Sequence, residues 1–266
     1  MRLNHKVIII TGSTTGIGKA IAKRCVQEGA RVIIHGLESD WASEVVDELG
    51  EDHAVSLIGD LSEQSVTREL VALAITRFGR LDAVVNNAAI VASSDIHTTD
   101  RAFMEKIFQV NTLAPLMLIQ AALHHLAAER GSVLNIGSVN AYSGEPNLLA
   151  YSISKGALMT LTRNLGDALH REHGVRVNQI NPGWVLTEKE AERKRKQGLS
   201  EDWFTTVPAT YAPSGRLLTP EEIATAAVYW LADESGPISG QVVDLEQHPF
   251  IGRNPPKDTQ TIPSKK

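Results

Sequence analysis

The sequence has a single cysteine in 266 residues, so it cannot form an internal disulfide and its fold does not depend on an oxidising compartment. The neighbours of Cys25, namely Ile21, Ala22 and Val26, are apolar, and we expect a buried structural thiol rather than a reactive one. With 42% hydrophobic and 21% charged residues, the composition is otherwise that of a globular protein. A chain of this length buries a full core, and one α/β domain is favoured over two small domains.

Long hydrophobic runs are also missing. The apolar run near the start covers only residues 7–10 before Thr11 and Gly12. Such a run is too short for the apolar region of a signal peptide or for a membrane span. We therefore expect no membrane association and a soluble, cytoplasmic protein.

An excess of positive charge is absent too. The net charge of −5 argues against a nucleic-acid partner. The charged run at 188–197 alternates in sign, which predicts a short helix with a solvated face. The nine histidines include no HxxxH pair, and the adjacent His124 and His125 point to different faces of a helix, so no metal site is expected.

What the sequence does contain is an alternation of short β-branched runs with longer helical patterns. The runs are continuously apolar, as in strands of a sheet that is covered on both faces. We predict strands at 7–10, 31–34, 54–58, 82–86, 132–137, 175–180 and 241–245. We predict helices at 16–28, 40–49, 62–78, 101–128, 151–172 and 219–232, with Ser62 and Asp100 as candidate N-caps.

This alternation predicts the fold class. Repeated right-handed βαβ units build a Rossmann-like, doubly wound parallel sheet of about seven strands, with helices on both faces in three α/β/α layers. Residues 1–251 are predicted to form this single Rossmann-fold domain, in which residues 184–216 are a long insertion of the kind that covers a substrate. The polar, Pro- and Lys-rich segment 252–266 is predicted to be a flexible or draped tail.

A glycine-rich turn follows the first strand directly and opens the first helix. Its spacing is G-x-x-x-G-x-G, and a turn of this kind lets the backbone approach a pyrophosphate at the helix N-terminus. Glycines also end strands for structural reasons, but the position in the first βα unit favours dinucleotide binding. The predicted cofactor contacts here are Gly12, Ser13, Thr14, Thr15, Gly16, Ile17 and Gly18.

The end of the second strand, where NAD and NADP are normally distinguished, has no charged reader. An acidic residue there holds a ribose hydroxyl and a nearby arginine holds a 2′-phosphate, but this chain has Gly36 and Leu37. The choice between NAD and NADP therefore stays open. After the third strand, Asp60 and Leu61 are suited to the adenine edge, although Asp60 equally suits a helix start.

Three polar residues converge on the same edge of the predicted sheet. Tyr151 and Lys155 are at i and i+4 of one helix and share a face, and Ser138 ends the fifth strand. Free tyrosine is too weak a base at neutral pH, and a nearby ammonium lowers its pKa. A serine hydroxyl can hold a carbonyl oxygen as charge develops on it. A Tyr-x-x-x-Lys pair alone is common, but this setting predicts a proton-transfer site beside a hydride carrier.

Taken in order, these residues resemble the short-chain dehydrogenase/reductase family over about residues 5–250. The resemblance rests on 11–18, Asn86-Asn87-Ala88, Asn111, Ser138, Tyr151 with Lys155, and Pro182-Gly183. It implies that Tyr151 is the general acid/base, that Lys155 tunes it and binds the nicotinamide ribose, that Ser138 orients the carbonyl, and that Asn111 holds a water in a proton relay. It also implies cofactor contacts from Asn87, Ala88, Ala89, Pro182, Gly183, Val185 and Thr187.

The chain departs from the family pattern at two places. Ala89 stands where the family usually has glycine, which is slightly costly if that position needs a positive φ. The last strand ends in Leu245-Glu246-Gln247-His248, which puts bulky polar groups near a substrate pocket or a subunit contact. The family resemblance also implies a homo-oligomer, with a tetramer favoured over a dimer.

Polar residues around the chemical site suggest a sugar, polyol or hydroxy acid as a small-molecule substrate. Asn140, Glu145 and Asn147 follow Ser138 and can bind hydroxyl groups or cap turns. The predicted substrate contacts are Ser138, Asn140, Asn147 and Trp184. The aromatic residues of the insertion (Trp184, Trp203, Phe204 and Tyr211) either line the substrate or pack the lid. The alternatives to a dehydrogenase are a non-catalytic NAD(P)-binding regulator and an epimerase or dehydratase that uses the cofactor transiently.

Overall fold

Seven parallel strands form one sheet with the order β3-β2-β1-β4-β5-β6-β7 in the computed structural model, which describes residues 1–142 and 144–251. The strands are β1 (Val7–Ile10), β2 (Arg31–Gly36), β3 (Ala54–Ile58), β4 (Ala83–Asn86), β5 (Ser132–Ile136), β6 (Arg176–Pro182) and β7 (Val242–Leu245). The predicted doubly wound parallel sheet is confirmed. The predicted tail at 252–266 lies outside the described residues.

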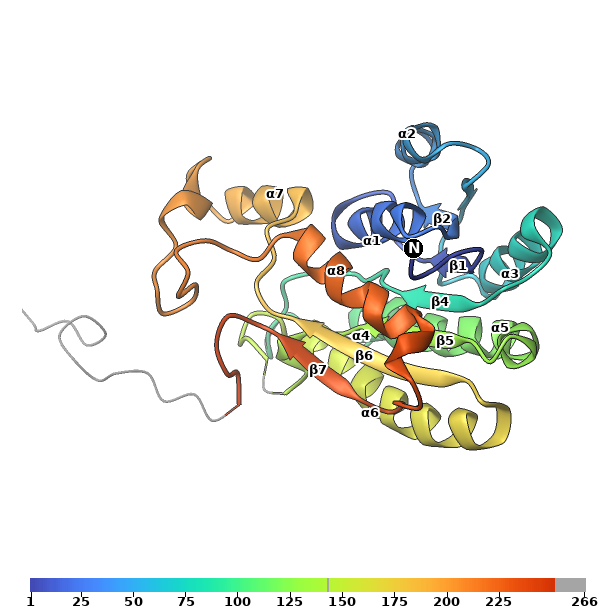
Figure 1. Cartoon of the computed structure of the whole chain (residues 1–266). Coiled ribbons are helices and arrows are strands. Elements are labelled where there is room, and N and C mark those ends of the chain that lie inside the picture. The colour runs from blue at the N-terminus through green and yellow to red at the C-terminus, as the bar shows by residue number, and fades with distance from the viewer. Residues whose placement is uncertain (143, 252–266) are drawn as a thin grey trace, which may run out of the picture.

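Helices cover both faces of this sheet, as Figure 1 shows for α1 and α8 on one side and α5 and α6 on the other. The helices are α1 (Gly16–Gln27), α2 (Ser39–Leu49), α3 (Gln64–Phe78), α4 (Arg101–Phe108), α5 (Ala114–Ala128), α6 (Leu149–His173), α7 (Glu188–Lys196) and α8 (Pro220–Leu231). Side chains of β1 alternate between the layers: Ile8 and Ile10 join the core under α1 and α8, whereas Val7 and Ile9 join the core under α3 and α5. A strand with two buried faces therefore reads as a continuous apolar run.

The helix predicted at 101–128 is interrupted. A π-helical turn at Gln109–Leu113 separates α4 from α5. Pro115 at the start of α5 has no N–H to give to the carbonyl of Asn111, which relaxes the normal α-helical hydrogen-bonding pattern at this turn. The segment Arg101–Ala128 is long and apolar enough to cross a membrane by length and composition. Its buried residues Leu118 and Leu126 nevertheless belong to the core beneath the sheet.

One of the two predicted helix caps is correct. Asp100 caps α4, since its carboxylate accepts a hydrogen bond from the Phe103 N–H at 2.8 Å. The prediction for Ser62 was wrong, because α3 begins two residues later and Glu63 is its N-cap residue. The Ser62 N–H instead donates to the Asp60 carboxylate at 2.8 Å, so a turn precedes the helix.

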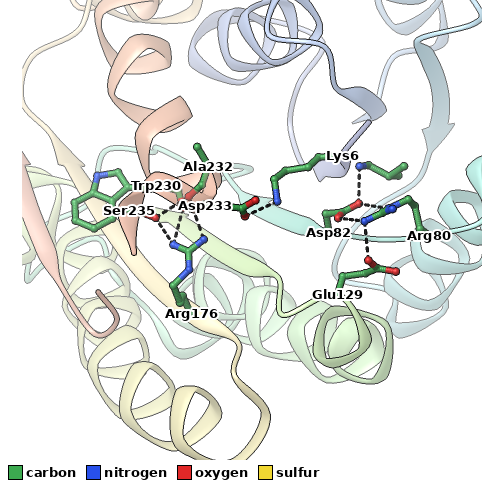
Figure 2. Close-up of polar contacts among 10 residues, drawn as sticks. Lys6, Arg80, Asp82, Glu129, Arg176, Trp230, Ala232, Asp233 and Ser235 are labelled. Carbon is green, nitrogen blue, oxygen red and sulfur yellow. Dashed lines mark hydrogen bonds and ion pairs between the residues drawn. The ribbon is translucent and has the colours of Figure 1, made fainter. Parts of the chain in front are cut away.

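A cluster of ion pairs ties the amino ends of the strands to the helices (Figure 2). The buried Asp82 carboxylate, just before β4, accepts hydrogen bonds from the Val7 N–H at 2.9 Å and from Arg80 at 2.8 and 2.6 Å. At the first residue of β6, the Arg176 guanidinium donates to the carbonyl of Trp230 at 3.1 Å and to the Ser235 hydroxyl. Ion pairs at Arg80 and hydrogen bonds at Arg176 thus stabilise the amino ends of the strands.

Candidate active site

A cavity of about 1190 Å³ opens at the carboxyl ends of the strands and runs beneath α7. It is lined by nearly all of the cofactor and substrate residues predicted from the sequence. These are Gly12, Thr14, Thr15, Gly16, Ile17, Gly36, Leu37, Asp60, Leu61, Asn87, Ala88, Ala89, Ser138, Asn140, Asn147, Tyr151, Lys155, Pro182, Gly183, Trp184, Val185 and Thr187. The convergence that the sequence predicts at one sheet edge is therefore present.

The glycine-rich turn has the shape that a dinucleotide pyrophosphate requires. Gly12 has φ +61°, and a Cβ there would lie 2.9 Å from the Ala88 Cα, so only glycine fits. The N-cap residue of α1 is Thr15, whose side chain caps no N–H, and the first turn of the helix carries no acidic residue. The first N–H groups of α1 are therefore without a side-chain cap or a competing carboxylate, which suits an anion at this helix end.

Two residues predicted to contact the cofactor lie behind the turn instead. The Ser13 side chain is fully buried, where its hydroxyl donates to the Ile10 carbonyl at 2.6 Å and accepts from the His35 N–H at 3.0 Å. A Cβ on Gly18 would lie 2.3 Å from the Gly12 carbonyl oxygen. Neither residue lines the cavity, because both hold the turn in place from within.

His35 is a supporting residue whose position the sequence did not reveal. Its Nδ1 accepts a hydrogen bond from the Gly12 N–H at 3.2 Å, and its Nε2 lies 3.1 Å from the Gly59 carbonyl oxygen. These partners assign a neutral ring with the proton on Nε2. Burial lowers the pKa of His35, which agrees with that neutral form.

At the adenosine end of the cavity, Gly36 and Leu37 at the end of β2 bring no charge, whereas Lys106 lines the cavity and acts on Asp60. A Cβ on Gly36 would lie 2.5 Å from Thr14 Cγ2, so glycine is required by packing against the turn. The adjacent Leu37 side chain is 62% exposed and brings no charge. Asp60 lines the cavity, and its carboxylate holds the Ser62 N–H in the turn before α3; its predicted contact with the adenine stays a prediction. The sequence-level ambiguity between NAD and NADP persists in the structure.

The chemical end brings Ser138, Tyr151 and Lys155 together. Ser138 follows β5, and α6 places Tyr151 and Lys155 one turn apart on the face that meets that strand. The Ser138 hydroxyl accepts from the Asn140 N–H at 3.1 Å, and its interaction with the Tyr151 hydroxyl lowers the pKa of Tyr151. The Lys155 ammonium lies 5.7 Å from the centre of the Tyr151 ring and donates to the Ile136 carbonyl at 2.7 Å.

Burial dominates the ionisation of both groups in the protein alone. It raises the pKa of Tyr151 to about 12, although the hydrogen bond from Ser138 opposes this, and it lowers the pKa of Lys155 to about 8. The prediction that Lys155 lowers the pKa of Tyr151 is therefore wrong for the protein without ligands. The ammonium is engaged by the Ile136 carbonyl beneath the ring, and the charges acting on Tyr151 come from Glu190, Arg193 and Glu145.

Asn111 does not reach the cavity with its side chain. Its Oδ1 accepts from the Ile90 N–H at 2.8 Å, and its Nδ2 donates to the Ile90 carbonyl at 3.1 Å and to the Ser154 hydroxyl at 3.0 Å. The residue is 1% exposed within the π-helical turn. The side chain thus fastens the loop after β4 to α6, and its predicted share in a proton relay remains a prediction.

The aromatic residues of the insertion mainly pack against one another. Trp184 stacks on Trp203 with ring centres 5.3 Å apart, and Tyr211 meets Trp184 edge-on at 6.1 Å. Trp203 forms a small core with Val207, apart from the cores of the sheet. The packing role considered from the sequence therefore accounts for most of this aromatic surface, while Trp184 also lines the cavity.

Two residues predicted to contact the nicotinamide, Thr187 and Gly183, are positioned by contacts with α7 and with the segment after β7. Thr187 caps α7, its hydroxyl accepting from the Glu190 N–H at 3.1 Å, and its methyl group faces Gly16 across the cavity mouth. A Cβ on Gly183 would lie 1.9 Å from the Glu246 carboxylate. The bulky polar run after β7 therefore contributes to the pocket itself, as Glu246 and His248 line the cavity. Ala89 does not need a positive φ, so the expected cost there does not arise.

Sequence reasoning missed several charged residues of this cavity, among them Glu190 and Arg193 of α7. The alternating charges of 188–197 suggested a solvated helix face, and one side of α7 is indeed exposed. Nothing local in the sequence shows which face of a charged helix turns inward. Among the residues that the structure describes, no group of three His, Cys, Asp or Glu side chains is arranged to hold a metal ion.

Comparison with known proteins gives consistent matches along nearly the whole chain. A model of a family described as enoyl-(acyl carrier protein) reductase matches residues 12–246. The L-fucose dehydrogenase of Mus musculus is 35% identical over 236 residues, which cover 88% of this chain and 84% of that protein. The 2-(S)-hydroxypropyl-CoM dehydrogenase 3 of Xanthobacter autotrophicus is 33% identical over 242 residues, 90% of this chain and 94% of its own. The NADP-dependent (R)-specific alcohol dehydrogenase of Lentilactobacillus kefiri is 29% identical over 238 residues, 88% and 92% of the two chains.

Proposed function

The chain belongs to the short-chain dehydrogenase/reductase family of NAD(P)-dependent oxidoreductases, and we propose that it interconverts a secondary alcohol and its carbonyl compound at the Ser138, Tyr151 and Lys155 site. The observation that carries this proposal is that Ser138, Tyr151 and Lys155 line the same cavity as the uncapped N-terminus of α1. When bound, the nicotinamide cofactor supplies or accepts the hydride.

The chain's own residues move the proton and position the oxygen. Tyr151 takes the hydroxyl proton of the alcohol, or returns it to the carbonyl oxygen, because its hydroxyl is a titratable group that lines the cavity together with Ser138. Ser138 donates to the same oxygen as charge develops there. With the cofactor bound, the positive charge of Lys155 would stabilise the tyrosinate form of Tyr151. Asn111 holds the loop after β4 against α6.

The proposal is tested by replacing the acid/base. Tyr151→Phe keeps the ring and removes the hydroxyl, so we expect turnover to fall by at least about 10²- to 10⁴-fold while cofactor affinity changes little. Tyr229→Phe on α8, away from the cavity, is the matched control. Substrate turnover and cofactor fluorescence titration are the measurements, and a fully active Tyr151→Phe enzyme would sink the assignment.

The same assay separates the two alternatives. A regulator would bind NAD(P)H and turn over no alcohol or ketone in a broad panel. An epimerase or dehydratase would retain tightly bound cofactor and convert substrate with no net change in NAD(P)H.

We propose a sugar, polyol or hydroxy acid as the substrate class. Asn140, Asn147 and Glu145 line the cavity beside Ser138, and a relative at 35% identity is an L-fucose dehydrogenase. For the cofactor we propose NAD or NADP with a modest preference at most, since Leu37 offers neither phosphate nor ribose a charged partner. A difference in NADH and NADPH affinity of about 1,000-fold, or roughly 4 kcal/mol, would contradict this.

We further propose that the protein works in the cytoplasm as a homo-oligomer, with a tetramer favoured over a dimer. The apolar Ile153 on α6 and Leu113 in the π-helical turn are 43% and 41% exposed in the single chain. Burying such side chains against a second copy would be favourable. Sedimentation analysis of the purified protein tests this, and a monomer at micromolar concentration would refute it.

A further inference from the structure

We propose that Arg193, held by Glu190, is the residue that reads a hydroxyl group of the substrate away from the reacting carbon, and that the substrate is an uncharged polyhydroxylated compound. This inference rests on the proposed function and narrows its substrate class. It assigns the specificity of the site to the lid helix α7 rather than to the residues around Tyr151.

The position of Arg193 is fixed from several sides. Its Nε and Nη2 donate to the two carboxylate oxygens of Glu190, each at 2.8 Å. The Glu190 carboxylate also accepts from Trp184 Nε1 at 2.9 Å, so the pair is anchored to the aromatic core of the lid. The side chains of Arg193 and Glu190 are only 19% and 14% exposed. A guanidinium held on one edge by a bidentate pair is pre-organised along its other edge.

That other edge lacks an acceptor. The Arg193 Nη1 is buried and has no hydrogen-bond partner among the described residues. Leaving a buried donor of a charged group unsatisfied is costly, and such a group calls for an explanation. Arg193 lines the cavity together with Tyr151, and its charge acts on the Tyr151 hydroxyl. The missing acceptor is therefore an oxygen of whatever occupies the cavity.

The surrounding charge decides between a hydroxyl and a carboxylate. The charged groups that shift the pKa of Tyr151 include Glu190, Arg193 and Glu145. Burial opposes the charge of Arg193, but Glu190 outweighs it and the pKa of Arg193 is raised, so its positive charge is already matched. A substrate carboxylate would therefore meet a guanidinium whose charge Glu190 already matches, so this position favours an uncharged hydroxyl over a hydroxy acid's carboxylate.

A hydroxyl group suits this arrangement because it both accepts and donates a hydrogen bond. Its oxygen can accept from Arg193 Nη1, while its proton goes to a carboxylate such as Glu145, which lines the same cavity. Paired donors and acceptors of this kind discriminate strongly against an analogue that lacks the hydroxyl, since the buried groups of the protein then stay unpaired.

The test compares Arg193→Gln with the wild-type enzyme in the presence of saturating NADPH or NADH. Binding of a panel of aldopentoses and aldohexoses is measured by calorimetry, which needs no turnover, and kcat/KM is measured in parallel. The best sugar is then compared with its monodeoxy analogues and with the corresponding uronic acid. Arg195→Gln is the matched control, because Arg195 lies on the same helix but pairs with Glu201 outside the cavity.

We expect Arg193→Gln to weaken binding of the best sugar by about 10- to 100-fold. One monodeoxy analogue should bind the wild-type enzyme more weakly than the parent sugar by a similar factor. Its affinity should not fall further in the Arg193→Gln variant. Arg195→Gln should behave as wild type. Cofactor affinity of the folded Arg193→Gln variant should stay unchanged, which separates a reading role from loss of the lid.

Four results would overturn the inference. Arg193→Gln could have no effect on binding, or the loss could be equal for the parent sugar and every deoxy analogue. The wild-type enzyme could also bind the uronic acid more tightly than the parent sugar, or bind no sugar at all. Failure of the proposed function looks different. In that case the wild-type enzyme turns over no alcohol or carbonyl compound, but the calorimetric comparison of sugar binding between wild type and Arg193→Gln still tests the role of Arg193.

Discussion

Among single residues, Lys155 is a cation that burial disfavours in the folded protein. It is 2% exposed, its ammonium has one carbonyl partner, and its pKa is lowered to about 8 from 10.5. A folded-state pKa below the unfolded value means that the unfolded chain binds the proton more tightly. The free energy of unfolding therefore rises as pH increases above about 8, and the gain is complete near 10.5.

This gives a prediction for Lys155→Met, which removes the titrating group and keeps the length of the side chain. Between pH 7 and 9.5, the wild-type protein should gain about 2 kcal/mol of unfolding free energy relative to the variant. The raised pKa of Tyr151 affects the free energy of unfolding mainly above pH 10, its ordinary pKa, and so has little effect between pH 7 and 9.5. Urea unfolding of both proteins without cofactor at the two pH values measures the difference. Parallel pH dependences would show that Lys155 keeps its ordinary pKa.

At this scale the sequence predicts residue types better than it predicts contacts. Ser138, Tyr151 and Lys155 can be found because their chemistry, spacing and strand-end positions are all local properties. Ser13 has the right neighbours for a cofactor contact, yet its side chain turns into the protein toward Ile10. Arg193 could not be found, because the inward face of α7 depends on the stacking of Trp184 on Trp203.

Among the elements, β5, α6 and β6 are joined by a buried line of polar side chains that apolar patterning does not reveal. Asn86 Nδ2 donates to Asn135 Oδ1, and Asn135 Nδ2 donates to the Thr162 hydroxyl, both at 2.8 Å. The Thr162 hydroxyl lies 2.8 Å from Gln179 Oε1, and Gln179 Nε2 donates to Asn181 Oδ1 at 2.7 Å. This buried network fixes how α6, and with it Tyr151, sits on the sheet.

Thr162→Val tests the network with almost no change in shape. The Asn135 and Gln179 amides would each lose a partner while fully buried, so we expect a loss of about 3 kcal/mol in unfolding free energy. The exposed Thr160 on the same helix provides the control, since Thr160→Val should change stability by less than about 0.5 kcal/mol. Equal unfolding midpoints for the two variants would show that the network contributes nothing.

The elements themselves were largely predictable, and the exceptions have local causes. Buried parallel strands read as apolar runs, so all seven appear at the predicted positions within a residue or two. The break at Gln109–Leu113 was missed because its apolar periodicity continues through the turn, and only Pro115 marks it. Ser62 is a residue type that often caps helices, but its N–H donates to the Asp60 carboxylate in a turn, and α3 begins only at Gln64.

For the whole molecule, the carboxyl ends and the amino ends of the strands serve different purposes. The carboxyl ends of the strands hold glycines, an uncapped helix end and buried groups with shifted pKa values, a combination that serves ligands. The amino ends hold ion pairs that cross from strands to helices, such as Lys6 with Asp233 at 2.7 Å (Figure 2). Stability and chemistry are thus separated along the strands, as expected when a fold places its site at one end of a rigid sheet.

The separation predicts opposite results for Asp82→Ala and Ser138→Ala. Asp82 is 2% exposed and holds both the Val7 N–H and the Arg80 guanidinium, so its loss should cost about 3 kcal/mol of unfolding free energy. Well below its unfolding temperature, that variant should keep the wild-type kcat/KM, because the cavity lies at the far edge. Ser138→Ala should unfold like the wild type and lose about 100-fold or more in kcat/KM. Thermal unfolding and steady-state kinetics of both variants decide the matter, and a catalytic defect in folded Asp82→Ala would show that the two edges are coupled through the strands.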